Sequence, residues 1–283
     1  MEHLVWHDRP PLHRPVLITA FEGWSDAGDA ATSAVEYLAD QWGANPVASI
    51  EAEEFFDFTA TRPRVEIDQF EQRHIVWPAN ELSAATVTDL DTDVVLLLGT
   101  EPQLRWKTFC RHITEAAEAL DVSMVITLGA LLAEVPHTRP TSVMGSSSDE
   151  ALATRFGLRP SRYQGPTGIT GVLHTACRDA GLPSASIWAA VPSYVPGAPS
   201  PKATLALVQR ISEMLASPVV VDDLQLATLS YEQQLDELVR EDDETLAYLT
   251  QLEERFDNDD DEFPTGVSLV EEVERFLRDQ RNE

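Results

Sequence analysis

The sequence predicts an α/β protein: a three-layer α/β/α domain with a mostly parallel or mixed central sheet, followed by a C-terminal helical tail. Apolar runs of strand length recur along the chain and are continuous rather than alternating, as in strands covered on both faces. Segments with helical spacing separate these runs. Beyond Ser217 the composition becomes acidic and a leucine pattern begins. We therefore expect a core domain over residues 1–217 and an acidic helical extension over residues 218–283.

The expected strands of the core are Pro15–Ala20, Val47–Ile50, Val94–Gly99, Met124–Gly129 and Ala185–Val191. Helical periodicity predicts helices at Trp106–Leu120, Thr167–Asp179 and Pro201–Leu215. The first of these helices would make residues 94–128 a βαβ unit, which is expected to be parallel and right-handed. Short alternating pieces between Phe55 and Pro78 indicate an excursion resembling a β-hairpin.

The tail contains apolar residues with a 3,4 spacing, namely Leu235, Leu238, Leu249, Leu252 and Phe256. Asp242 and Thr245 occupy polar positions in the same seam. Like charges, Pro264 and Gly266 then end the pattern. A final short helix is expected to carry Val267, Leu269, Val270, Val273, Phe276 and Leu277. Two interpretations stay open: the tail folds back on its own domain, or it is a docking or oligomerisation helix.

Charge excludes some classes of partner. The 283-residue chain has a formal net charge of −28, and from Asp222 onward 21 acidic residues face five arginines and no lysine. This charge argues against a non-specific binder of nucleic acid or of anionic membranes, because phosphates would be repelled. We find neither a signal peptide nor an apolar run of the roughly 18 residues that span a bilayer. Cys110 and Cys177 show no pairing pattern, so a cytoplasmic location is expected.

The turn Phe21–Ala31 is the most informative stretch, because it joins a predicted buried strand to a small-residue helix. Asp26 could cap that helix with Asp29 in support, and Ser25 is the alternative cap. Crowded carboxylates at Glu22, Asp26 and Asp29 could instead hold a cation or work as acid and base. The turn has no phosphate-binding glycine motif, and Ser25 lacks the context of a nucleophile elbow.

Other candidate groups are more scattered. The histidines form no zinc-protease motif, although His137 and His174 could converge with Glu22. The stretch Tyr163–Leu173 has glycines at positions 165, 168 and 171, which suit either exposed amides that bind an anion or close packing on the sheet. The stretch Val191–Pro201 is rich in proline and predicts a stiff loop.

Together these stretches resemble the proteasome assembly chaperone 2 family in its bacterial, actinobacterial-looking form. The resemblance covers roughly residues 1–216 and is carried by Phe21–Gly28, by Leu128–Ala130 with Val135–His137, by Gly165–Gly171 and by Val191–Tyr194. It implies an α/β/α fold like that of nucleoside phosphorylases and related hydrolases. It also implies self-association, with a trimer as one arrangement, and a role of the kind that eukaryotic and archaeal relatives have, in proteasome assembly or protein handling. The family supplies no catalytic residues, so none is assigned, and neither is a metal or a cofactor.

The leading hypothesis is therefore a non-enzymatic, homo-oligomeric factor that binds proteasome subunits or other protein clients. The candidate surface comprises Glu22, Trp24, Ser25, Asp26, His137, Gly165, Thr167, Gly168 and Tyr194. The alternative is a hydrolase or phosphorylase-like enzyme acting on a small molecule at the turn Glu22–Asp29. That alternative requires Glu22 and Asp26 to face a pocket and to approach His137, His174 or the amides of residues 165–171. A purely structural oligomer is the third possibility.

Overall fold

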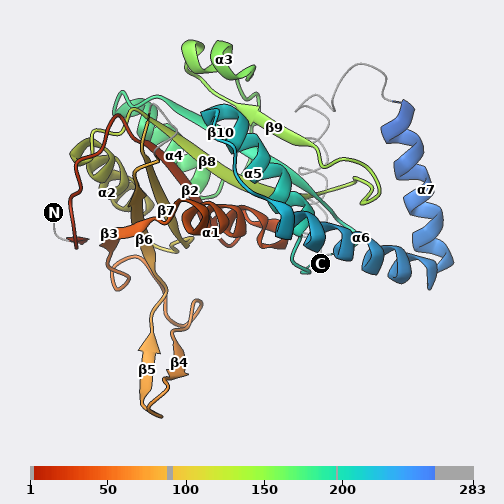
Figure 1. Cartoon of the computed structure of the whole chain (residues 1–283), viewed down its shortest axis with the longest axis horizontal. Helices are drawn as coiled ribbons and strands as arrows, with labels where there is room; N and C mark the ends of the chain where they lie inside the picture. The colour runs from red at the N-terminus through yellow and green to blue at the C-terminus, as the bar shows by residue number, and fades with distance from the viewer. Residues whose placement is uncertain (1–2, 88–91, 196, 259–283) are drawn as a thin grey trace.

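The computed structural model describes residues 3–87, 92–195 and 197–258 (Figure 1). Its core is one mixed eight-stranded sheet, with the strands in the order β1-β3-β6-β7-β2-β8-β10-β9. Their bounds are β1 Leu4–Trp6, β2 Val16–Glu22, β3 Asn45–Ile50, β6 Asn80–Ala85, β7 Val94–Thr100, β8 Met124–Ala133, β9 Val143–Ser146 and β10 Ser184–Pro192. The predicted α/β class with a mixed sheet is confirmed.

The four central strands β7, β2, β8 and β10 are parallel, whereas the outer pairings are antiparallel. The expected βαβ unit is present in a modified form. Both β7 and β8 run parallel to β2, and β2 lies between them. The helix between β7 and β8 therefore crosses over one intervening strand. The short strands β1, β6 and β9 were not predicted.

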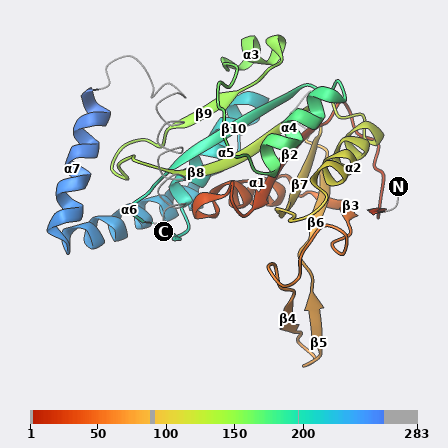
Figure 2. The same cartoon turned by 180° about the vertical axis from the view of Figure 1, so that it is seen from behind.

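Helices cover both faces of the sheet (Figure 2). The helices α1 (Ala30–Trp42) and α5 (Pro201–Leu215) pack on one face, where Ala34, Leu38 and Leu207 are buried. The helices α2 (Trp106–Ala119) and α4 (Ile169–Asp179) pack on the other face, with Phe109 and Leu173. Strand β2 supplies both cores, because its side chains alternate between the two faces. The short helix α3 (Glu150–Phe156) lies beside β9 and β10.

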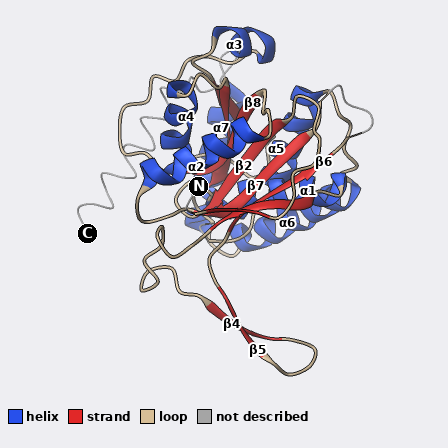
Figure 3. Cartoon of the chain, turned by 90° about the vertical axis from the view of Figure 1, so that its left-hand side faces the viewer, coloured by secondary structure: helices blue, strands red, loops and turns tan. Residues whose placement is uncertain are grey.

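The expected hairpin is confirmed within residues 55–78. Strands β4 (Arg64–Ile67) and β5 (Arg73–Val76) form a separate two-stranded sheet. Figure 3 shows that this hairpin extends away from the body of the protein. All eight of its strand residues are exposed.

The described part of the tail forms two helices instead of the single seam that the leucine spacing suggested. The helix α6 (Asp222–Arg240) packs on α5, and α7 (Asp243–Asn258) follows after a break. At this break the Asp242 carboxylate accepts hydrogen bonds from the Glu244 and Thr245 amides, so Asp242 is a helix cap rather than a seam residue. The leucine spacing predicts Leu238 in the seam, but Leu238 is 54% exposed. The predicted helix carrying Val267 and Leu277 lies outside the described residues.

Within the described ranges, no helix has both the length and the apolar character needed to cross a membrane.

Candidate binding surface

The turn after β2 is fixed against the neighbouring strand. The Ala130 amide of β8 donates a hydrogen bond of 2.8 Å to the Ser25 carbonyl, and Asp26 forms a β-bridge with Ala130. The turn begins at Gly23, whose φ of +128° belongs to a region that side chains rarely adopt. It ends in a 3₁₀ turn, Ala27–Asp29, that leads directly into α1. The turn is therefore attached to β8 and lies at the carboxyl end of the parallel strands.

The Asp26 side chain binds the first amides of α1, as a cap does, although the residue at the N-cap position of this helix is Asp29 and not Asp26 as expected. Its Oδ1 accepts hydrogen bonds from the Ala31 amide at 2.7 Å and from the Thr32 amide at 3.2 Å. The Thr32 hydroxyl donates to Oδ2. Burial raises the pKa of the Asp26 carboxyl, although these hydrogen bonds oppose the shift. The side chain therefore faces the first turn of its own helix.

We expect Asp26→Ala and Asp26→Asn to have different effects on stability. Alanine removes the cap and should lower the free energy of unfolding by about 1–2 kcal/mol. Asparagine keeps an oxygen for the Ala31 amide and carries no charge. The folded-state pKa of Asp26 is raised, so binding of a proton to Asp26 stabilises the folded protein. This stabilisation is fully present below the unfolded pKa of about 3.8 and is lost as pH rises through the folded pKa. Urea denaturation at pH 4 and pH 7 should therefore show the asparagine variant gaining on wild type at the higher pH. Equal losses for both variants would contradict the capping role.

Glu101 connects the first turn to the glycine-containing stretch, and sequence reasoning missed it. Its amide donates to the Glu22 carbonyl at 2.9 Å, and its Oε1 accepts from the Ile169 amide at 2.7 Å, at the start of α4. A carboxylate at the positive end of a helix is stabilised there. The sequence does contain a signal for Glu101: it follows the predicted strand Val94–Gly99, just as Glu22 follows the predicted strand Pro15–Ala20. Strand ends of this kind commonly carry functional groups in α/β folds.

Gly168 allows these groups to lie together. A Cβ atom at this position would lie 2.7 Å from Ser25 Oγ, 2.8 Å from Glu101 Oε1 and 3.0 Å from the Trp24 ring. Close packing is thus the interpretation that the structure supports for Gly168. Ser25 is buried and its hydroxyl has no hydrogen-bond partner among the described residues, whereas the Trp24 side chain is 48% exposed.

The remaining residues of the predicted surface flank this contact. Glu22 Oε2 accepts a hydrogen bond from the Thr100 hydroxyl at 3.1 Å. Gly165 and Thr167 belong to the loop before α4, where the Tyr163 hydroxyl donates to the Pro166 carbonyl at 2.6 Å. The structure therefore brings together one group, Trp24, Ser25, Glu101 and Gly168, with Glu22, Gly165 and Thr167 beside it. We call the four residues Trp24, Ser25, Glu101 and Gly168 the strand-end surface.

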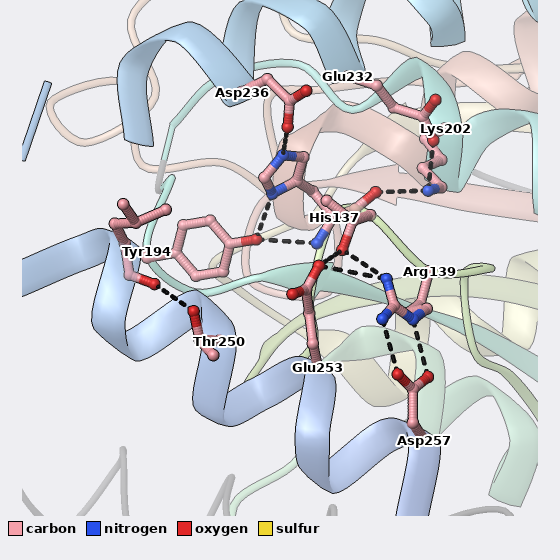
Figure 4. Close-up of polar contacts among 11 residues, drawn as sticks. His137, Arg139, Tyr194, Lys202, Glu232, Asp236, Thr250, Glu253 and Asp257 are labelled. Carbon is pink, nitrogen blue, oxygen red and sulfur yellow. Dashed lines mark hydrogen bonds and ion pairs between the residues drawn. The ribbon is translucent and has the colours of Figure 1, made fainter. Parts of the chain in front are cut away.

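His137 and Tyr194 form a second cluster with the tail helices (Figure 4). The His137 amide donates to the Tyr194 oxygen at 2.8 Å, and the same hydroxyl lies 2.7 Å from Nδ1 of His137. The Tyr194 hydroxyl can therefore donate a hydrogen bond to Nδ1, which makes Nε2 the ring nitrogen that carries the proton. That nitrogen lies 3.1 Å from Asp236 Oδ1 of α6. The ring is fully buried and holds the tail against the core.

Further charged pairs extend this tail contact. Lys202 donates to the His137 carbonyl and pairs with Glu232 of α6. Arg139 binds both carboxylate oxygens of Asp257 at 2.8 and 2.7 Å and lies 3.2 Å from Glu253 in α7. These hydrogen bonds raise the pKa of Arg139 and lower that of Asp257. The cavity beside them has a volume of about 10 Å³, room for at most about one water molecule.

The structure thus separates two sets of residues that the sequence grouped as one surface. His137 contacts Tyr194, Lys202 and the tail, and His174 contacts Ser184 at 3.0 Å. The hydrogen bonds of His137 go to Tyr194 and Asp236, that of His174 goes to Ser184, and that of Glu22 comes from Thr100, so these bonds do not join the histidines to Glu22 as the suggested convergence required. Residues 222–258 fold back on their own core, as the first of the two interpretations of the tail expects for this part of it, whereas the predicted helix that carries Val267 lies outside the described residues. In the described part of the chain, no three His, Cys, Asp or Glu side chains are grouped to hold a metal ion.

Comparison with known proteins identifies the family. A family model described as the PAC2 family matches residues 20–239. The chain belongs to the PAC2 family. This family membership confirms the resemblance found at the strand-end turns.

Solved structures of PAC2 proteins are similar over most of the chain. A PAC2 family protein from Streptomyces avermitilis is 42% identical with a TM-score of 0.77, and the match covers 83% of this chain and 99% of that one. A proteasome-assembly chaperone homologue from Mycobacterium tuberculosis is 44% identical with a TM-score of 0.75 and the same coverage.

More distant structures share the PAC2 fold alone. PbaB from Pyrococcus furiosus, an archaeal proteasome activator, is 16% identical with a TM-score of 0.68, and the match covers 84% of this chain and 99% of that one. The comparison with curated proteins finds no match.

Proposed function

We propose that this PAC2 protein is a non-enzymatic, self-associating factor of the assembly-chaperone type that binds other proteins, proteasome subunits among them. Its family supports a chaperone-like role, because a 44% identical relative is described as a proteasome-assembly chaperone homologue. We also place it in the cytoplasm. Support for that location comes from Cys110 and Cys177, which are buried free thiols as expected in a reducing compartment.

One observation carries the protein-binding role: the carboxylates of Asp26 and Glu101, at and beside the strand-end surface, are hydrogen-bonded to helix amides, whereas its aromatic residue Trp24 is half-exposed. Asp26 and Glu101 each accept hydrogen bonds from amides at the start of a helix. A general acid or base must instead reach the proton that it transfers. Trp24 is half-exposed on a turn that is hydrogen-bonded to β8, and tryptophan is enriched among residues that dominate binding at protein interfaces.

The test measures binding of purified proteasome α and β subunits from the same cell to the full chain. We expect Trp24→Ala to weaken binding at least about tenfold, as for a central interface residue. Trp77→Ala is the matched control, since Trp77 is equally exposed at 49% but lies near the hairpin. Equal losses in both variants, or no binding by wild type to either subunit, would contradict the proposal.

A further inference from the structure

The hairpin β4–β5 has one apolar face with nothing packed on it in the described chain. Val65 and Ile75 are directly opposite each other, and Ile67 is opposite Arg73. Because side chains alternate along a strand, these four residues share one face, which is apolar except for Arg73. Arg64, Glu66, His74 and Val76 share the other face. Val65, Ile67 and Ile75 are 52%, 69% and 59% exposed. Such alternation is typical of strands with one buried face.

The hairpin is nevertheless well formed at its tip. Asp68 Oδ1 accepts hydrogen bonds from the Phe70 amide at 2.8 Å and from the Gln72 amide at 2.9 Å. Its Oδ2 lies 2.9 Å from His74 Nε2. These contacts lower the pKa of Asp68, with the His74 hydrogen bond as the largest cause. A two-stranded hairpin alone is at best marginally stable in water, whereas a sheet of three or more strands with an apolar face can be stable by itself.

The outer edge of β4 has backbone groups free to pair. The Asp68 amide donates to the Gln72 carbonyl at 3.0 Å, so positions 68 and 72 are a hydrogen-bonded pair. In an antiparallel ladder such pairs alternate, which makes Glu66 with His74 the next hydrogen-bonded pair. The amide and carbonyl of Val65 therefore point away from β5, toward the open edge.

The balanced charge of the hairpin allows a second copy of this acidic chain to pair with the edge of β4. Residues 61–77 contain three arginines and three acidic residues, in a chain with a net charge of −28. Two copies therefore meet here without the like-charge repulsion that opposes contact between acidic surfaces. In an antiparallel pairing centred on Val65, Arg64 of each copy lies opposite Glu66 of the other. The edge of β5 has no such match, because a pairing centred on Ile75 places His74 opposite Val76.

We propose that β4 pairs with β4 of a second copy in antiparallel register centred on Val65, forming a four-stranded sheet. The inference rests on the self-association included in the proposed function and names the segment responsible. The two Val65 residues become a hydrogen-bonded pair, flanked by two Arg64–Glu66 pairs on the opposite face. The contact is two-fold, so it joins copies in pairs, and a trimer would need another interface.

Charge reversal tests the pairing on the full chain by sedimentation velocity. Arg64→Glu places like charges opposite each other twice, and so does Glu66→Arg. Each should weaken self-association at least about tenfold. The double variant Arg64→Glu/Glu66→Arg should restore it, and an equimolar mixture of the two single variants should form a heterodimer. Because these side chains are exposed, circular dichroism should show unchanged folding.

Cross-linking tests the register. Val65→Cys should form a disulfide-linked dimer under mild oxidation, since residues opposite each other lie about 5.5 Å apart between Cα atoms. Ile67→Cys is the control, because its copies would be separated by four residues, about 13 Å along the strand. The native Cys110 and Cys177 are buried. A cross-link at 67 but not at 65 would overturn the register.

The outcomes separate this inference from the proposed function. A wild-type oligomer unchanged by Arg64→Glu would overturn the hairpin contact and leave self-association intact. A monomeric wild type at about 100 μM, well above typical interface affinities, would overturn both the contact and self-association. Binding of proteasome subunits and its dependence on Trp24 is measured separately and survives either result.

Discussion

Replacing Gly99 with alanine is expected to lower the free energy of unfolding by about 3 kcal/mol. A Cβ atom there would lie 1.9 Å from Oδ1 of Asn80 and 2.9 Å from the carbonyl oxygen of Ala79. Asn80 is fully buried on β6, directly opposite Gly99 on β7. The added methyl group therefore has to displace a packed side chain and the backbone beside it. Urea denaturation followed by circular dichroism measures the loss.

Two further variants separate this clash from a general effect of alanine. Neither polar atom of the Asn80 side chain has a partner among the described residues, so Asn80→Ala removes the obstacle without breaking a hydrogen bond. The double variant Gly99→Ala/Asn80→Ala should recover more than half of the lost stability. Gly171→Ala is the control. The added methyl group would meet the Thr167 hydroxyl, which can rotate away, and position 171 lies in helix α4, where alanine is favoured over glycine. A Gly99→Ala protein as stable as wild type would show that β6 and β7 are less tightly packed than described.

Replacing Leu235 with alanine should cost about 2–4 kcal/mol, whereas Leu238→Ala should change stability by less than about 0.5 kcal/mol. Leu235 is 4% exposed in α6, which packs on α5. Leu238 lies three residues later in the same helix and is 54% exposed. The two variants remove the same atoms from the same helix, so the difference measures burial of the tail on the core.

The same two variants also distinguish α6 packed on the core from a coiled-coil seam. A coiled-coil seam, as the leucine spacing suggested, would make both leucines matter equally. Thermal or urea unfolding of each variant gives the comparison. Similar losses for Leu235→Ala and Leu238→Ala would mean that α6 buries a different face, such as one covered in an oligomer.

Much of the fold was predictable because buried strands and amphipathic helices leave a local pattern. The helix Pro201–Leu215 was predicted with its observed bounds, since proline suits the first turn of a helix. The structure adds a local cap, in which Ser200 accepts a hydrogen bond from the Ala203 amide. The parallel strands were found from their continuous apolar runs. The strand β6, Asn-Glu-Leu-Ser-Ala-Ala, was missed because its polar residues conceal a strand that is largely buried.

The candidate site was only half predictable. Asp26 was recognised as a cap because the capping pattern lies within a few residues of sequence. Glu101, Arg139 and Asp236 were not found, since their partners Ile169, Asp257 and His137 are more than 60 residues away. No local pattern records such distances. Grouping His137 with Glu22 failed for the same reason.

By itself the sequence determined the α/β class, the acidic charge, the capped turn after β2 and the resemblance to the PAC2 family, because each depends on neighbouring residues or on composition. Only the tertiary structure decided that Glu101 joins two distant turns through Gly168, that α6 buries Leu235 but exposes Leu238, and that the hairpin has an open apolar face. The physical reason is that packing and pairing depend on which surfaces meet. That choice is made by the whole chain at once, through the apolar area that each arrangement removes from water.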